Sequence, residues 1–146
     1  MLKTTDGTPE FDLLAPLDTD IDVLDRVDQL ISQNERRDRS LWLLFLSADA
    51  LQLPVILPID GMPADPEPDD AERICDVVAT VLEDAAPGGS VVITLVRAVD
   101  GGTTESDQRW LMAFKAAAAR RDVRIRLFCL ATTDGVRRLE LQAERS

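Results

Sequence analysis

The stretch that most constrains the fold is residues 90–96, Ser-Val-Val-Ile-Thr-Leu-Val, in which five of the seven residues are β-branched. A run of this kind predicts a strand that is buried on both faces, at the centre of a sheet. A polar loop follows at 100–103, and Thr104 then opens a predicted helix over 105–121, with apolar residues at helical spacing at Trp110, Phe114 and Ala117. Because α/β proteins commonly carry their chemistry where such a strand leads into a helix, this segment is the first candidate for a functional site.

Helical and strand patterns surround this central strand on both sides. The sequence predicts helices at about 19–34 and 69–86, and strands at 41–46, 52–59, 123–131 and 136–141. The predicted fold class is therefore α/β (α+β), a two-layer or three-layer mixed sheet with the element order α-β-β-α-β-α-β-β, in which the N-terminal helix is an addition. We expect residues 1–16 to be a flexible lead and residues 17–146 to form a single domain.

The apolar stripes of the first two helices predict which faces are buried. The stripe of the first helix consists of Ile21, Leu24, Val27, Leu30 and Ile31, and that of the second of Ile74, Val77, Val78, Val81 and Leu82, with Cys75 beside it. A helix as short as the first is marginal in water by itself. It is therefore expected to pack on its own sheet, and it is also a candidate contact for a homodimer.

Prolines predict the position of one strand in the sheet. Pro54 and Pro58 both lie in the strand expected at 52–59. If the strand alternates regularly, their missing N–H groups fall on the same side, so the strand pairs along its other side only. We therefore expect this strand at an edge of the sheet.

Length and charge set outer limits on the class of protein. A chain of 146 residues is long enough for one domain with a sizeable core. Its net charge of −11 is uneven, because residues 1–96 carry 20 acids and 6 bases whereas residues 97–146 carry 7 acids and 10 bases. The basic surplus near the end keeps nucleic-acid binding as an alternative, although the charge of the whole chain opposes contact with phosphates. No apolar run approaches the ~20 residues of a membrane helix, and residues 1–7 lack the apolar core of a signal peptide.

The residue types that usually perform catalysis are scarce. Histidine is absent, which removes the commonest general base and the commonest metal ligand. Cys75 and Cys129 occur without a CxxC motif, which predicts two buried thiols in a reducing cytoplasm. Fourteen of the sixteen basic residues are arginine, a bias typical of GC-rich bacterial genomes.

The order of the predicted elements resembles that of the cytidine-deaminase-like and JAB/MPN group of folds. JAB/MPN metalloproteases and their RadC-like branch carry His-x-His at the end of the central strand, seven further residues, and then Ser-x-x-Asp at the helix start. Placing that Asp on Asp107 puts the Ser on Thr104 and the two His on Thr94 and Val96, without a gap. The resemblance covers about residues 41–141, including the alanine-rich helix end at 116–119 and the hairpin at 133–136. The Asp-His pair of RadC-like proteins falls near Leu127 and Phe128.

The resemblance implies a zinc site, and this chain departs from it at the zinc ligands. Such a site needs two imidazoles, a carboxylate and a water molecule, with a neighbouring Glu to accept the proton of that water. Thr94 and Val96 cannot replace the imidazoles, and the hairpin at 41–59 contains no Glu. Thr104 and Asp107 also have a local explanation, since a Thr at the N-cap and an acid three residues later form a capping box. We therefore expect no zinc and no other cofactor.

These observations favour a single function class and leave two alternatives. The sequence predicts a non-catalytic interaction or regulatory domain that resembles a degenerate JAB/MPN (RadC-like) module, with a homodimer or another protein as partner. The first alternative is a small-molecule-binding or enzymatic domain whose pocket no motif reveals. The second is a nucleic-acid-associated protein that uses the arginines of the last strands.

Overall fold

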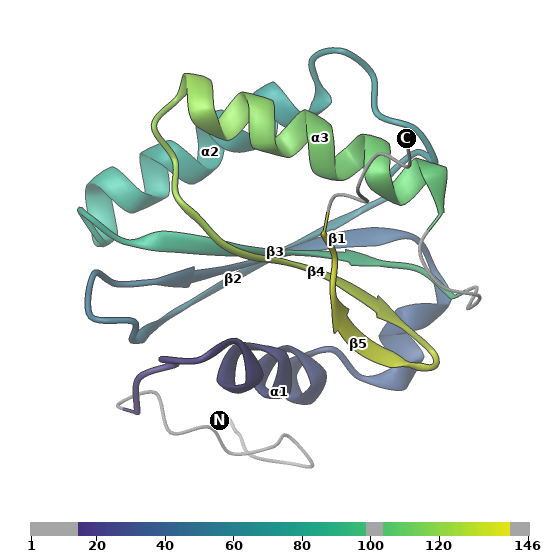
Figure 1. The fold of residues 1–146 in the computed structure, drawn as a ribbon, viewed down its shortest axis with the longest axis horizontal. Coiled ribbons are helices and arrows are strands. Elements are labelled where there is room, and N and C mark those ends of the chain that lie inside the picture. The colour runs from purple at the N-terminus through teal and green to yellow at the C-terminus, as the bar shows by residue number, and fades with distance from the viewer. Residues whose placement is uncertain (1–14, 99–103, 141–146) are drawn as a thin grey trace, which may run out of the picture.

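The apolar run at 90–96 forms β3 (Ser90–Val96), every residue of which is buried, and it is the central strand of a five-stranded sheet. The computed structural model describes residues 15–98 and 104–140. Across the sheet the order is β2-β1-β3-β4-β5, where β3 runs antiparallel to β1 (Ser40–Leu46) and parallel to β4 (Ile125–Thr132) (Figure 1). The expectation of a buried central strand is thus confirmed.

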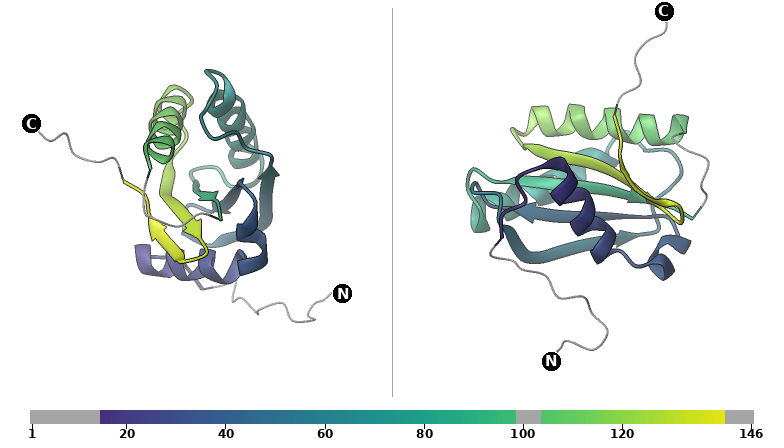
Figure 2. Two further views of the ribbon diagram at one scale, coloured as in Figure 1. Left: turned by 90° about the vertical axis from the view of Figure 1, so that its right-hand side faces the viewer. Right: turned by 60° about the horizontal axis from the view of Figure 1, so that its bottom comes forward.

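Helices cover both faces of this sheet, which gives three layers. The helices α2 (Asp70–Ala85) and α3 (Glu105–Arg120) pack on one face, and α1 (Asp20–Leu30) lies on the opposite face (Figure 2). The alternation along β3 divides the core accordingly. Val91, Ile93 and Leu95 face α2 and α3, whereas Val92 and Val96 face α1. The predicted α/β fold is confirmed in its three-layer form.

The first helix is shorter than the sequence pattern predicts, and its buried face includes most of the predicted stripe but not Ile21. It ends at Leu30 rather than near Asn34, because Ile31 has an extended backbone and Ser32 caps a separate 3-10 helix, η1 (Gln33–Arg37). The expected stripe included Ile21, which is 68% exposed. Val27 and Ile31 of the predicted stripe are buried, Leu24 and Leu30 are half-buried, and Val23 and Arg26 are buried in addition.

The stripe of α2 is also displaced from the predicted one. Val77 is 49% exposed, and the buried face consists of Ala71, Cys75, Val78 and Leu82. Ala71 was not part of the predicted stripe, whereas Cys75 was expected beside it and buried. In contrast, Trp110, Phe114 and Ala117 of α3 are fully buried as predicted, and the Trp110 and Phe114 rings stack with centroids 5.7 Å apart.

The proline-bearing strand β2 (Gln52–Asp60) lies at an edge of the sheet, as predicted. The argument from simple alternation holds only for part of it. Pro58 pairs with Trp42 in a regular ladder, whereas Pro54 lies within a register shift between the pairs Leu44–Ile56 and Leu46–Gln52. At the other edge the last strand is shorter than predicted, since β5 comprises Gly135–Arg138.

Candidate functional site

A buried ion pair closes the carboxyl end of β3, where the sequence directed attention. Arg97 directly follows β3 and Asp107 lies in the first turn of α3, and their side chains are 6% and 0% exposed. Arg97 Nε donates to Asp107 Oδ1 at 3.1 Å, and Arg97 Nη2 donates to Asp107 Oδ2 at 2.7 Å. This two-point geometry is the strong form of an arginine–carboxylate interaction, and it fixes the start of α3 to the end of the central strand.

Thr104 and Asp107 form the predicted capping box at the start of α3. The Asp107 N–H donates to Thr104 Oγ1 at 3.2 Å, and the Thr104 N–H donates to Asp107 Oδ2 at 2.9 Å. Asp107 therefore accepts three hydrogen bonds through its carboxylate, two from Arg97 and one from the backbone. The local explanation holds for Thr104 but is incomplete for Asp107, because a cap residue alone does not require complete burial.

The other two positions of the resembled motif face a different part of the molecule. Val96 belongs to the apolar cluster beneath α1, and Thr94 lines a small apolar cleft on the same side. The Thr94 side chain also makes a hydrogen bond with the Cys129 thiol. Asp107 is instead bonded to Arg97 beside α3, so the structure does not join Thr94 and Val96 with Asp107 into one site. The predicted loop at 100–103 lies outside the described residues.

This arrangement holds its polar groups in place and offers no free group for chemistry. Arg97 engages both oxygens of the Asp107 carboxylate, and the Thr104 N–H donates to one of them as well, so the carboxylate is committed to contacts within the protein. Among residues 15–98 and 104–140, no three side chains of the types that bind metals lie close enough together to hold an ion. The geometry is therefore that of a structural anchor.

Arg97 is the residue of this site that the sequence analysis did not identify. A signal was present, because a single arginine directly follows six residues that are apolar or β-branched, at 91–96. A charged side chain at the end of a fully buried strand needs a partner, and the first turn of the predicted helix offers two acids, Glu105 and Asp107. The capping explanation had already accounted for Asp107, so this pairing was not considered.

The two cysteines are free and buried on opposite sides of the sheet. Cys75 packs with the cluster under α2 and α3, and Cys129 with the cluster under α1. Burial raises the pKa of the Cys75 thiol to about 11 and that of the Cys129 thiol to about 12. Both therefore stay protonated and unreactive in the folded protein at neutral pH, as the sequence predicted.

We expect these thiols to make the protein less stable at alkaline pH. Their folded-state pKa values lie above the ~8.5 of an unfolded thiol, so their contribution is complete below that pH and is lost as the pH rises toward 11 and 12. Each thiol should lower the free energy of unfolding by about 1.4 kcal/mol per pH unit above ~8.5. Urea denaturation between pH 8 and 10.5 measures this slope. The matched control is a Cys75→Ala/Cys129→Ala variant, in which an unchanged slope would contradict the assignment to the thiols.

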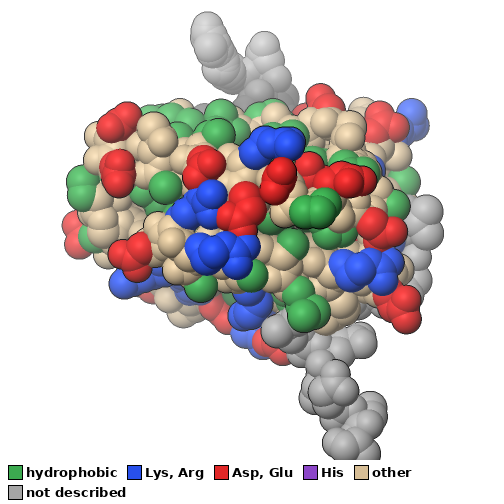
Figure 3. All heavy atoms as spheres, turned by 90° about the horizontal axis from the view of Figure 1, so that it is seen from above, with side chains coloured by type: hydrophobic (Ala, Val, Ile, Leu, Met, Phe, Trp, Pro, Cys, Tyr) green, Lys and Arg blue, Asp and Glu red, His purple; other side chains and the backbone are tan. Residues whose placement is uncertain are grey.

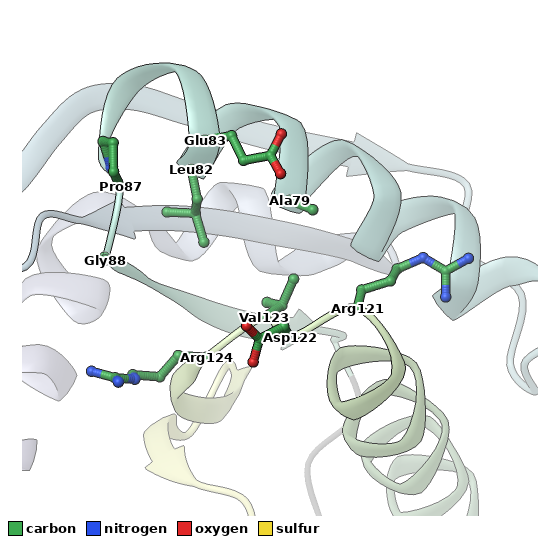
Figure 4. Close-up of a pocket in the computed structure, with 10 residues that line it drawn as sticks. Ala79, Leu82, Glu83, Pro87, Gly88, Arg121, Asp122, Val123 and Arg124 are labelled. Atoms are coloured by element: carbon green, nitrogen blue, oxygen red, sulfur yellow. The ribbon is translucent and has the colours of Figure 1, made fainter.

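A groove lies at the opposite end of the sheet, between the end of α2 and the residues that lead into β4. It has a volume of about 650 Å³ and is open to solvent. Its charged residues have mixed signs and do not converge on a point, since Arg121 and Arg124 extend in opposite directions (Figure 4). Arg121 is also engaged with Glu72 and Asp76 of α2. Ligand sites usually present a few convergent polar groups in an apolar pocket, and this groove lacks that arrangement.

The arginines of the second half of the chain bind acids of the first half. On the α2–α3 face, where acidic and basic side chains are interspersed, Arg120 and Arg121 pair with Glu72 (Figure 3). On the other face Arg126 and Arg138 both bind Asp20 of α1, at 2.8 and 2.6 Å. The uneven charge along the sequence thus becomes a set of contacts between elements, which reduces the positive charge left for a nucleic acid.

Comparison with known proteins gives no match, either to the model of a known family or to a curated protein. In the part of the chain that the structure describes, no helix is both long and apolar enough to cross a membrane.

Proposed function

We propose that the chain is a non-catalytic protein-interaction domain that works in the cytoplasm. The observation that carries the proposal is the closed carboxyl end of β3. The place where an α/β sheet usually exposes reactive groups is occupied by Arg97 and Asp107, which are bonded to each other and buried. A fold that commits these groups to structure is more consistent with binding through its surface than with catalysis.

The proposal includes a relationship to JAB/MPN domains of the RadC-like type in which the metal site has been lost. Two features support it: the element order from β1 to β5, and the position of Thr104 and Asp107 at the start of the helix after the central strand. The places of the family's two histidines hold Thr94 and Val96, both buried. In this proposal the scaffold of the family is kept and its zinc chemistry is not.

The surface that we propose for binding is the part of the α1 face that α1 leaves open. It is formed by Leu30, Trp42, Ile56 and Pro58, which we call the Trp42 shelf. The first three are half-buried and Pro58 is exposed. Pro58 pairs directly with Trp42 across the β1–β2 ladder, and Leu30 and Ile56 line the same apolar cleft as Trp42. Aromatic side chains in such positions are enriched in protein interfaces.

The charge of the chain decides which partner we propose. A second copy would bring together two chains that each carry a net charge of −11, and this repulsion opposes a symmetric dimer. We therefore propose a different protein as the occupant of the Trp42 shelf, with an apolar contact surface surrounded by basic residues. A homodimer is an outcome of the test below.

The test compares Ile56→Lys with Val55→Lys, which change adjacent residues of β2 that point to opposite faces of the sheet. Ile56 packs against the cluster under α1, whereas Val55 is 37% exposed. Both variants are used as bait in quantitative affinity capture from the source cells, and light scattering measures their oligomeric state. Thermal unfolding verifies that both are folded.

We expect Ile56→Lys to capture at least tenfold less of the partner than the wild type does, because it places a lysine in an apolar contact. Val55→Lys should capture as much of the partner as the wild type. If the wild type is a dimer and only Ile56→Lys dissociates it, the Trp42 shelf is still a binding surface, and its partner is a second copy of the chain. If the wild type is a monomer and all three baits capture the same proteins in the same amounts, the Trp42 shelf is not a binding surface and the proposal fails.

A further inference from the structure

The two helical layers are attached to the sheet in different ways. On one face α2 and α3 have 16 residues each, contact each other, and enclose the aromatic residues Trp110, Phe114 and Phe128. On the other face α1 has 11 residues and is the one α-helix that packs there among residues 15–98 and 104–140. Segments with less buried apolar contact are the ones that open most readily in a native protein.

Charged contacts join α1 and η1 to the rest of the protein at both ends of the segment. Near its start, Asp20 accepts hydrogen bonds from Arg126 of β4 and Arg138 of β5. Beyond its end, Arg36 of η1 binds the Asp28 carboxylate at 2.9 Å and the Thr132 carbonyl at 3.0 Å. Exposed ion pairs contribute little to stability, and the cost of removing two charges from water cancels much of the attraction within a buried pair. These contacts therefore orient α1 more than they stabilise it.

The apolar contact between these two ends is narrow. Val23, Val27 and Ile31 are the large apolar residues of this segment that are fully buried, whereas Leu24 and Leu30 are half-buried. The segment precedes β1 in the sequence and contributes no strand to the sheet. It can therefore leave the sheet without breaking a strand pair.

We propose that α1 and η1 form a cover that opens as a unit while the sheet and the α2–α3 layer stay folded. Opening uncovers the apolar face formed by Val92, Val96 and Cys129 of β3 and β4. The fold thus has one permanently buried sheet face and one that is exposed in a minor state. This inference goes beyond the proposed interaction function and does not depend on it.

The cysteines provide one reporter for each layer. Cys129 and Cys75 are both 0% exposed, the first under α1 and the second under α2. A thiol buried in this way reacts with iodoacetamide only after the structure around it opens. If the cover opens separately, Cys129 should be alkylated faster than Cys75 in the native protein, as measured by peptide mass spectrometry at pH 8.

Two matched variants separate local from global opening. Val27→Ala removes two methyl groups under α1, and Val78→Ala removes the same two under α2, at residues that are 2% and 0% exposed. Val78→Ala destabilises the closed and the cover-open states equally, because the α2–α3 layer is intact in both. It should therefore raise the alkylation rate of Cys75 about tenfold and leave that of Cys129 unchanged. Val27→Ala should raise the alkylation rate of Cys129 by a similar factor.

The opposite result is equally distinct. If Val78→Ala accelerates both cysteines by the same factor, Cys129 reacts only through global unfolding and the cover does not open separately. Equal rates for the two cysteines in the wild type would also overturn the inference. Thermal unfolding of both variants verifies that each is folded at the temperature of alkylation. Because no partner takes part, failure of this experiment leaves the test of the Trp42 shelf unaffected.

Discussion

Replacing Asp107 with alanine is expected to lower the free energy of unfolding by about 3–5 kcal/mol, the usual cost of removing one partner of a buried ion pair. The change leaves the Arg97 guanidinium in a site where its side chain is 6% exposed, without the carboxylate that accepts from its Nε and Nη2. It also removes the acceptor for the Thr104 N–H. Urea denaturation at pH 7 measures this loss.

Two control variants separate the ion pair from the capping box. Thr104→Ala removes only the cap of α3 and should cost about 1 kcal/mol. The double variant Arg97→Met/Asp107→Leu removes both charges and should be substantially more stable than Asp107→Ala alone, because no buried guanidinium is then left without the Asp107 carboxylate. If Asp107→Ala and Thr104→Ala have equal effects, Asp107 is only a cap residue and the anchor described above is wrong.

The sequence predicts the arrangement of the strands well, because each strand carries its signal locally. The apolar run of β3 requires burial on both faces, and the prolines of β2 are compatible with an edge and not with the centre of the sheet. The same holds for α3, because Trp110, Phe114 and Ala117 recur at helical spacing and define its buried face. These features depend on residue types and spacing, which the sequence contains in full.

The predictions for α1 and α2 are less accurate for a common physical reason. Ile21 and Val77 fit the apolar period of their helices but are exposed, since the width of the buried stripe depends on how far the neighbouring layer extends. The buried face of α2 also includes Ala71 and Cys75, whose small side chains lie outside the predicted apolar stripe. The extent of the neighbouring layer is not encoded within the helix itself.

Within the candidate site, only the contacts between residues close together in the sequence are predictable. The capping box at Thr104 lies within four residues and was found from their types. The pairs Arg97–Asp107 and Asp20–Arg126 join residues 10 and 106 positions apart, and only the fold brings them together. The charges that the sequence analysis treated as surface asymmetry therefore belong to the contacts that hold the layers in place.

Arg36 is expected to be the second residue whose replacement has a large effect. It is 1% exposed, although it lies in a run of five charged residues at 35–39 that gives no local sign of burial. Its Nε and Nη2 donate to the Ile31 carbonyl at 3.0 and 2.7 Å, and its Nη1 donates to the Thr132 carbonyl at 3.0 Å. It thus satisfies a carbonyl at the end of α1, which has no basic residue in its last turn, and joins that helix to the end of β4.

The variant Arg36→Met keeps most of the side-chain volume and removes the donors. The two carbonyls then stay buried without partners, each at a cost of about 1–3 kcal/mol, so the free energy of unfolding should fall by roughly 2–5 kcal/mol in total. The matched control is Arg37→Met, which changes the next residue of η1, an exposed arginine, and should have an effect within about 0.5 kcal/mol. Urea denaturation of both variants measures the difference. Equal stabilities would mean that solvent replaces Arg36 at these carbonyls, and that α1 is held to the sheet by its apolar residues alone.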